Sequence, residues 1–122
     1  GPSIPRTLLR HFQNGALAVA ISPTLLGELI DVATRPSLRR LIQLETLGQL
    51  IDNLREDARL VRPIRIPRVV DADPDDDRLF ACALAAGASW ILSGDAAVCA
   101  VTRYESIRIA RPADFLSWLS SH

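Results

Sequence analysis

The stretch Asp73-Pro-Asp-Asp-Asp77 carries four carboxylates in five positions, and the apolar run Leu79-Phe-Ala-Cys-Ala-Leu-Ala-Ala86 follows it. Asp76 to Ala86 is predicted to form a helix that Gly87 ends, because glycine readily takes the left-handed backbone found after helices. Hard divalent cations bind several carboxylate oxygens held together near buried structure. An acidic cluster directly before a buried helix therefore favours a metal site.

Short strands alternate with helices along the rest of the chain. The strand predicted over 89–93 leads directly into Asp95, which is expected to cap a short helix. Further strands are predicted over 16–21, 60–66 and 107–110, and further helices over 5–14, 22–34, 44–59, 95–102 and 112–120. Ser22 and Pro23 are predicted to open the second helix. This order predicts an α/β layered fold with a mostly parallel sheet.

Three carboxylates are expected at one end of that sheet, because ligands of such folds bind beyond the carboxyl ends of the strands. Glu28 lies on the helix after the strand 16–21, on the border of its apolar face, where a side chain can reach a cleft. Asp76 lies on the interior side of its helix, and Asp95 directly follows a strand. The three side chains are predicted to converge.

Each acidic residue also has an ordinary structural explanation. Asp76, Asp77 and Asp95 are all suited to be N-caps, and this reading is preferred for Asp77. Glu28 alone is typical of a solvated helix carboxylate, and Asp73 and Asp75 are typical turn residues around Pro74. The combination favours the metal site, because three carboxylates aimed at one cleft would repel each other without a cation. The chain has no lysine to neutralise them.

The composition fits one compact domain over residues 1–122, since 48% of the residues are hydrophobic. No apolar run is long enough to cross a bilayer and no signal peptide is apparent, so a cytoplasmic protein without membrane contact is expected. Cys82 and Cys99 are expected to be reduced, because they lie in apolar helical patterns without a CxxC partner.

All fourteen basic residues are arginine, and eight of them fall between Arg35 and Arg68. The guanidinium fork suits phosphate recognition, so this cluster weakly supports a phosphate-bearing substrate. A codon bias towards arginine explains the missing lysine better. The net charge of zero does not itself indicate a nucleic-acid partner.

The order of these motifs resembles the PIN-domain family, and most closely its branch of toxin nucleases related to VapC. The resemblance covers nearly the whole chain. It rests on these segments, in order: Ser22-Pro-Thr-Leu-Leu-Gly-Glu28-Leu, Arg35-Pro-Ser-Leu-Arg39, Asp73-Pro-Asp-Asp-Asp77, Ala85-Ala-Gly-Ala88 and Leu92-Ser-Gly-Asp95.

The resemblance implies a Rossmann-like α/β/α sandwich and a Mg²⁺- or Mn²⁺-dependent endoribonuclease of a toxin–antitoxin system. It implies Glu28, Asp76 and Asp95 as catalytic residues and metal ligands. Ser93 and Asp77 are possible additional site residues. Arginines of the 35–68 region, with Arg35, Arg39 and Arg40 as candidates, would contact the RNA backbone. An antitoxin protein and a second copy of the chain are the further partners that it suggests.

Two departures from the family pattern matter. The chain starts where the first helix of the family starts, without the preceding strand and its metal-binding aspartate. Ala97 stands where relatives often carry another acidic residue. We therefore expect impaired cleavage. The alternative is a catalytically inactive PIN-like module that works through protein contacts. The helix over 44–58 could be core or a dimer surface, and we favour core with partial use in dimerisation.

Overall fold

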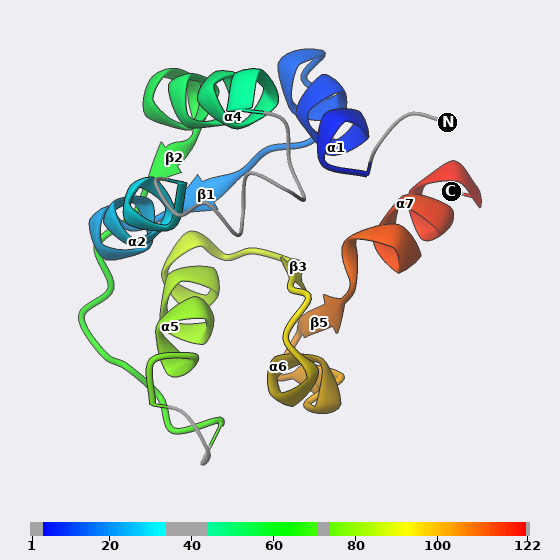
Figure 1. Ribbon diagram of the computed structural model, residues 1–122. Coiled ribbons are helices and arrows are strands. Elements are labelled where there is room, and N and C mark those ends of the chain that lie inside the picture. The colour runs from blue at the N-terminus through cyan, green and yellow to red at the C-terminus, as the bar shows by residue number, and fades with distance from the viewer. Residues whose placement is uncertain (1–3, 34–43, 71–73, 122) are drawn as a thin grey trace. The chain divides into compact units, whose positions relative to one another are not determined.

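The computed structural model describes residues 4–33, 44–70 and 74–121 (Figure 1). Helices and short strands alternate along these residues, which confirms the predicted α/β class. The chain divides into two compact units, Gly1–Leu60 and Val61–His122. None of the helices in the described ranges is long and apolar enough to span a membrane.

Within its described residues, 4–33 and 44–60, the first unit combines three helices with a two-stranded parallel sheet. Its elements are α1 (Ile4–Gln13), β1 (Ala20–Ile21), α2 (Pro23–Ala33), α4 (Leu44–Asp57) and β2 (Arg59–Leu60). In the sheet, Ala20 pairs with Arg59 and Ile21 with Leu60. β1 is shorter than the strand predicted over 16–21. The difference arises because the amides of Ala16 and Leu17 donate to the carbonyl of His11, in the turn that follows α1.

Helix α2 begins as the sequence predicts. Ser22 is buried, and the amide of Leu25 donates to its Oγ at 3.2 Å, so the hydroxyl satisfies one of the exposed N–H groups of the first turn. Pro23 is the first residue of the helix, where its missing N–H has no consequence. This cap fixes where β1 ends and α2 starts.

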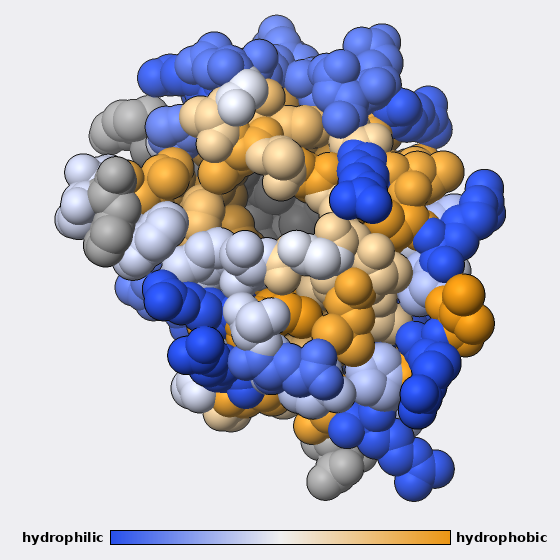
Figure 2. All heavy atoms as spheres, turned by 180° about the vertical axis from the view of Figure 1, so that it is seen from behind, coloured by the Kyte–Doolittle hydropathy of each residue, from blue (hydrophilic) through white to orange (hydrophobic). Residues whose placement is uncertain are grey.

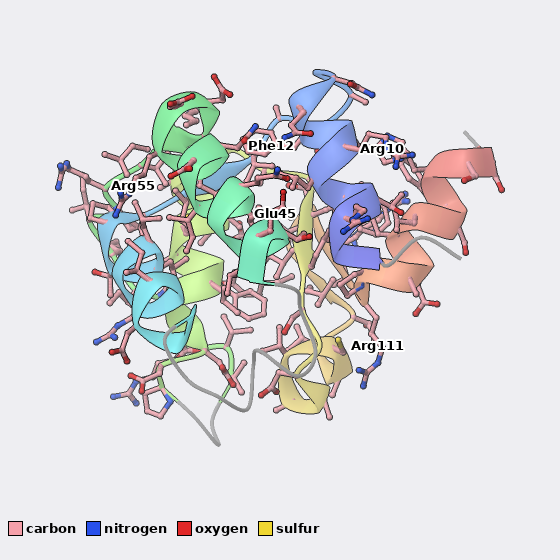
Figure 3. The ribbon with its side chains drawn as sticks, turned by 45° about the horizontal axis from the view of Figure 1, so that its top comes forward. Arg10, Phe12, Glu45, Arg55 and Arg111 are labelled. Carbon is pink, nitrogen blue, oxygen red and sulfur yellow. The ribbon has the colours of Figure 1, made fainter. Side chains whose placement is uncertain are left out.

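The core of the first unit lies between helices and the small sheet. Figure 3 shows Phe12 on the side of α1 that faces α4. Its ring packs in one buried cluster with Ile21 from β1 and Leu54 from α4. The apolar stripe of α4 is therefore used as core in this unit, and Leu47 is only 1% exposed.

The second unit is built around a three-stranded sheet in the order β3-β5-β4. Its elements are α5 (Asp77–Ala86), β3 (Trp90–Leu92), α6 (Ala96–Ala100), β4 (Arg103–Tyr104), β5 (Ile107–Ala110) and α7 (Pro112–Ser121). β3 and β5 are parallel, with Ile91 opposite Ile109, whereas β4 and β5 are antiparallel. α5 ends at Gly87, whose φ of 64° is the left-handed conformation predicted for that position.

A single apolar cluster holds this unit together. Buried side chains from α5, α6 and the sheet form it, together with one residue of the preceding chain: Val70, Phe80, Ala83, Ile91, Val98, Ile107 and Ile109. Phe80 is fully buried and its ring meets Tyr104 edge-on, with centroids 5.6 Å apart. Cys82 and Cys99 are both free thiols, as predicted.

Aromatic packing attaches α7 to the sheet. Trp90 of β3 lies 5.2 Å from Phe115 and 5.0 Å from Trp118, measured between ring centroids. The guanidinium carbon of Arg108 lies 5.4 Å from the centroid of a Trp90 ring, a cation–π arrangement. The half-buried Trp90 therefore contacts α7 through aromatic rings and β5 through Arg108.

Two strand predictions were wrong. The strand predicted over 60–66 ends at Leu60, since residues 61–66 form no ladder and Pro63 has no N–H to contribute. β4 was not predicted at all. It is bounded by Thr102 and Glu105, which both have positive φ without being glycine, so no turn residue in the sequence marks this hairpin.

Asp77 supports the start of α5 by a contact that its position in the sequence does not suggest. Its side chain is 6% exposed, and Oδ1 accepts hydrogen bonds from the amides of Val69 at 2.9 Å and Val70 at 2.7 Å. The N-cap role preferred for Asp77 is wrong, because Asp76 occupies that position. Asp77 instead holds the chain before α5 against the core.

We expect Phe80→Ala to lower the free energy of unfolding by about 3–5 kcal/mol, because a fully buried ring is replaced by a cavity. Leu84→Ala in the same helix is the matched control. Leu84 is 38% exposed, so its truncation should cost about 1 kcal/mol or less. Urea unfolding followed by circular dichroism measures both values. Equal losses would contradict the core assigned here.

We expect Asp77→Ala to cost about 2–3 kcal/mol, because one buried and one partly buried amide lose a charged acceptor. Asp77→Asn keeps a carbonyl oxygen and should lose less. Asp75→Ala removes an exposed carboxylate two residues away and should change stability little. The same unfolding experiment compares the three variants. If Asp75→Ala lowered the free energy of unfolding as much as Asp77→Ala, then the number of carboxylates before α5 would matter rather than the hydrogen bonds of Asp77.

Candidate functional site

Asp95 is positioned by the turn that follows β3. It is the N-cap of α6, with extended backbone angles (φ −77°, ψ 127°), and its side chain is exposed. Oδ1 accepts from the amide of Ala97 at 2.8 Å and from that of Val98 at 3.2 Å. The predicted cap is therefore present. Since both hydrogen bonds use Oδ1, Oδ2 is left available to bind a cation.

The Ser93-Gly94 turn before Asp95 is fixed by side-chain contacts. The amide of Asp95 donates to Oγ of Ser93 at 3.0 Å, and Sγ of Cys99 donates to the carbonyl of Ser93 at 3.2 Å. Nη1 of Arg111, labelled in Figure 3, donates to the carbonyl of Gly94 at 3.0 Å. The turn is thus tied to both α6 and the start of α7, which sets the direction of the Asp95 carboxylate.

Asp76 stands at the start of the other helix of the site. It is the N-cap residue of α5 with helical backbone angles (φ −65°, ψ −27°), its side chain makes no capping hydrogen bond, and it is half-buried. Asp76 thus differs from Asp95, whose side chain accepts the capping hydrogen bonds of its helix.

Asp76 and Asp95 lie at the same end of the second unit. α5 packs against β3, and only residues 87–89 connect them, so helix and strand run in opposite directions. The start of α5 is consequently at the end where β3 finishes. In Figure 1 the starts of α5 and α6 both lie towards the lower edge of this unit. The topology thus puts the backbones of Asp76 and Asp95 at one end of the unit, and their convergence in a site stays a prediction.

The neighbouring aspartates have different surroundings. Asp75 is exposed and forms an ion pair with Arg78, with Nη1 and Oδ1 3.7 Å apart. Asp77 is buried, and its Oδ1 accepts hydrogen bonds from two backbone amides, so this oxygen already has a structural role. Asp73 lies outside the described residues. Of this acidic run, Asp76 is the residue whose position best suits a site at the end of β3.

The remaining candidates belong to the first unit. Glu28 lies within α2, but its side chain is outside the described part of the structure. Arg35, Arg39 and Arg40 also fall outside the described residues. The convergence of Glu28 with the two aspartates, and the contact of these arginines with RNA, therefore stay predictions.

The chemistry of the described donors suits a hard cation. Mg²⁺ is commonly held by one or two carboxylates and keeps several waters, and Asp76 and Asp95 offer carboxylate oxygens at one end of a sheet. Within the described ranges, no group of three His, Cys, Asp or Glu side chains could hold a metal ion. A metal site on these two aspartates therefore needs further ligands, for which water is one source.

Comparison with known protein families identifies a match. The PIN domain family matches residues 1–97, a range that includes Glu28, Asp76 and Asp95 and ends two residues beyond the last of them. Searches among curated proteins and among solved structures gave no match. PIN domains are generally metal-dependent nucleases. Because the match covers most of the chain, this protein belongs to the PIN-domain family.

Proposed function

We propose that this protein is a metal-dependent ribonuclease that cleaves RNA phosphodiester bonds with Glu28, Asp76 and Asp95 as its acidic residues. The family match over residues 1–97 carries this proposal, because it spans all three. Their spacing also agrees with the motif order of the family. The finer assignment to RNA rests on the resemblance to toxin nucleases.

The second unit supports the proposal by geometry. Asp76 and Asp95 begin two different helices at the end where β3 finishes. The turn around Gly94 holds Asp95 in place before any ligand arrives, so little ordering is needed on binding.

The proposed roles follow from these positions. Glu28, Asp76 and Asp95 would hold Mg²⁺ or Mn²⁺, with the hydroxyl of Ser93 beside them. When bound, such an ion activates water and stabilises negative charge on the scissile phosphate. Arg35, Arg39 and Arg40 would bind the RNA backbone and orient it. Because backbone contacts carry no sequence information, they would set affinity rather than the choice of target.

The biological setting is also part of the proposal. The resemblance to VapC-related proteins suggests a toxin controlled by an antitoxin, acting as a homodimer. α4 supplies the candidate dimer surface, since Glu45, Gly48 and Gln49 are exposed beside its buried stripe. Sedimentation of the purified chain at several concentrations would test the dimer.

A catalytically inactive interaction module is the second candidate. It is favoured by Ile64 and Ile66, which are 99% and 58% exposed although both are strongly apolar. Exposed aliphatic groups of this size serve contacts with other molecules better than they serve catalysis.

We expect the chain to cut a labelled single-stranded RNA in Mn²⁺, at an impaired rate, and not in EDTA. Asp95→Asn should reduce the rate by roughly 100-fold or more, because the ligand charge is lost. Asparagine is as good an N-cap as aspartate, so the variant should keep its fold. Asp76→Asn should have a similar effect. Gel analysis of the products over time gives the rates.

Asp114→Asn is the matched control, because Asp114 is an exposed carboxylate in the first turn of α7, in the same unit. It should leave the rate unchanged. Mn²⁺ binding, followed by electron paramagnetic resonance, should weaken in Asp95→Asn and not in the control. Folded protein that binds Mn²⁺ but does not cut RNA would contradict the nuclease and favour the interaction module.

A further inference from the structure

The chain between β2 and α5 carries an unusual set of exposed side chains. Residues 61–70 form neither helix nor strand. Arg62, Arg65 and Arg68 follow each other at three-residue steps, and all three are exposed. No hydrogen bond or ion pair holds their guanidinium groups within the described ranges. We call residues 60–68 the basic segment.

Aliphatic side chains of the basic segment are exposed as well. Leu60 is 51%, Ile64 99% and Ile66 58% exposed. Among the described residues, these are three of the four exposed large hydrophobic side chains, the other being Leu84. Scattered exposed hydrophobic residues are normal on protein surfaces, but three within seven positions are a local concentration.

The basic segment is held at both ends. Leu60 pairs with Ile21 in the parallel sheet of the first unit. After the segment, the amides of Val69 and Val70 are bound by Asp77, and Val70 belongs to the core of the second unit. In Figure 2 this part of the chain lies at the right-hand edge, where hydrophobic spheres protrude between hydrophilic ones. The exposed side chains therefore belong to a segment whose two ends are held in place.

Two prolines make the basic segment suited to binding without refolding. Pro63 and Pro67 fix their own φ angles and restrict the residues before them to extended conformations. A segment with few accessible conformations loses little entropy when a partner orders it. Neither proline can donate a backbone hydrogen bond, so recognition must use the side chains.

We propose that the basic segment binds an acidic polypeptide segment that also carries aliphatic side chains. From Arg59 to Val70 there is no acidic residue, so an acidic partner meets complementary charge along the whole segment. Carboxylates of the partner would bind the arginines in bidentate pairs. Its aliphatic groups would cover Ile64 and Ile66, and this removes apolar surface from water.

The aliphatic side chains favour a polypeptide over a nucleic acid. Single-stranded RNA is typically bound by arginines together with aromatic rings on which bases stack. The basic segment contains no aromatic residue. Phosphate groups alone would leave Ile64 and Ile66 in water. This inference concerns a binding site in its own right and does not depend on nuclease activity.

Fluorescence anisotropy of a labelled ten-residue peptide of alternating glutamate and leucine tests the proposal on the full chain. We expect saturable binding, and weaker binding of a peptide in which serine replaces leucine. Ile64→Ser should weaken binding several-fold, and Arg62→Gln with Arg65→Gln should weaken it at least tenfold. These side chains are exposed, so thermal unfolding should be unchanged in both variants.

The double variant Arg10→Gln with Arg55→Gln is the matched control. It removes the same charge from exposed positions on α1 and α4, both labelled in Figure 3. Binding should be retained. An equal loss of binding in this control would show that only the net charge of the protein matters, and it would overturn the proposal. Equal binding of the serine peptide would also overturn it, as would binding of a ten-nucleotide RNA but not of the leucine peptide. A dimer that Ile64→Ser dissociates would assign the surface to a second copy instead.

Discussion

The second unit depends on one buried carboxylate. Asp77 is taken out of water, which would be costly for an ionised group without partners. The amides of Val69 and Val70 supply them, and in return these amides are satisfied at the point where the chain enters the core. The start of α5 and the position of Val70 are thereby fixed together. Asp76, one residue earlier, is placed by this same contact.

Three consecutive aspartates therefore do three different things. Asp75 is exposed and pairs with Arg78, Asp76 occupies the N-cap of α5, and Asp77 is buried. Successive residues at a helix start point about 100° apart, so the three adjacent side chains have different surroundings: exposed for Asp75, half-buried for Asp76 and buried for Asp77. A buried anchor next to a candidate ligand also explains why the acidic run needs more than one carboxylate.

Local signals in the sequence predicted most of the fold. Ser22, Gly87 and Asp95 mark helix ends through hydrogen bonds or backbone angles that their residue types favour, and all three do so in the structure. Strand lengths were less predictable, because strands of two residues depend on tertiary pairing rather than on an alternating pattern. The placement of Asp76 and Asp95 followed from the order of elements. Their relation to Glu28 depends on contacts distant in sequence, which no local pattern determines.

Two residues on either side of β4 adopt a backbone conformation that their side chains disfavour. Thr102 and Glu105 adopt left-handed backbone angles, with φ of 60° and 52°, at a steric cost of about 1 kcal/mol each for a side chain with a Cβ. Glycine would relieve that cost but would give the unfolded chain more freedom. Asparagine tolerates the conformation with less loss. A β-branched side chain in place of Glu105 would raise the steric cost of this turn, since such side chains are rare at positive φ.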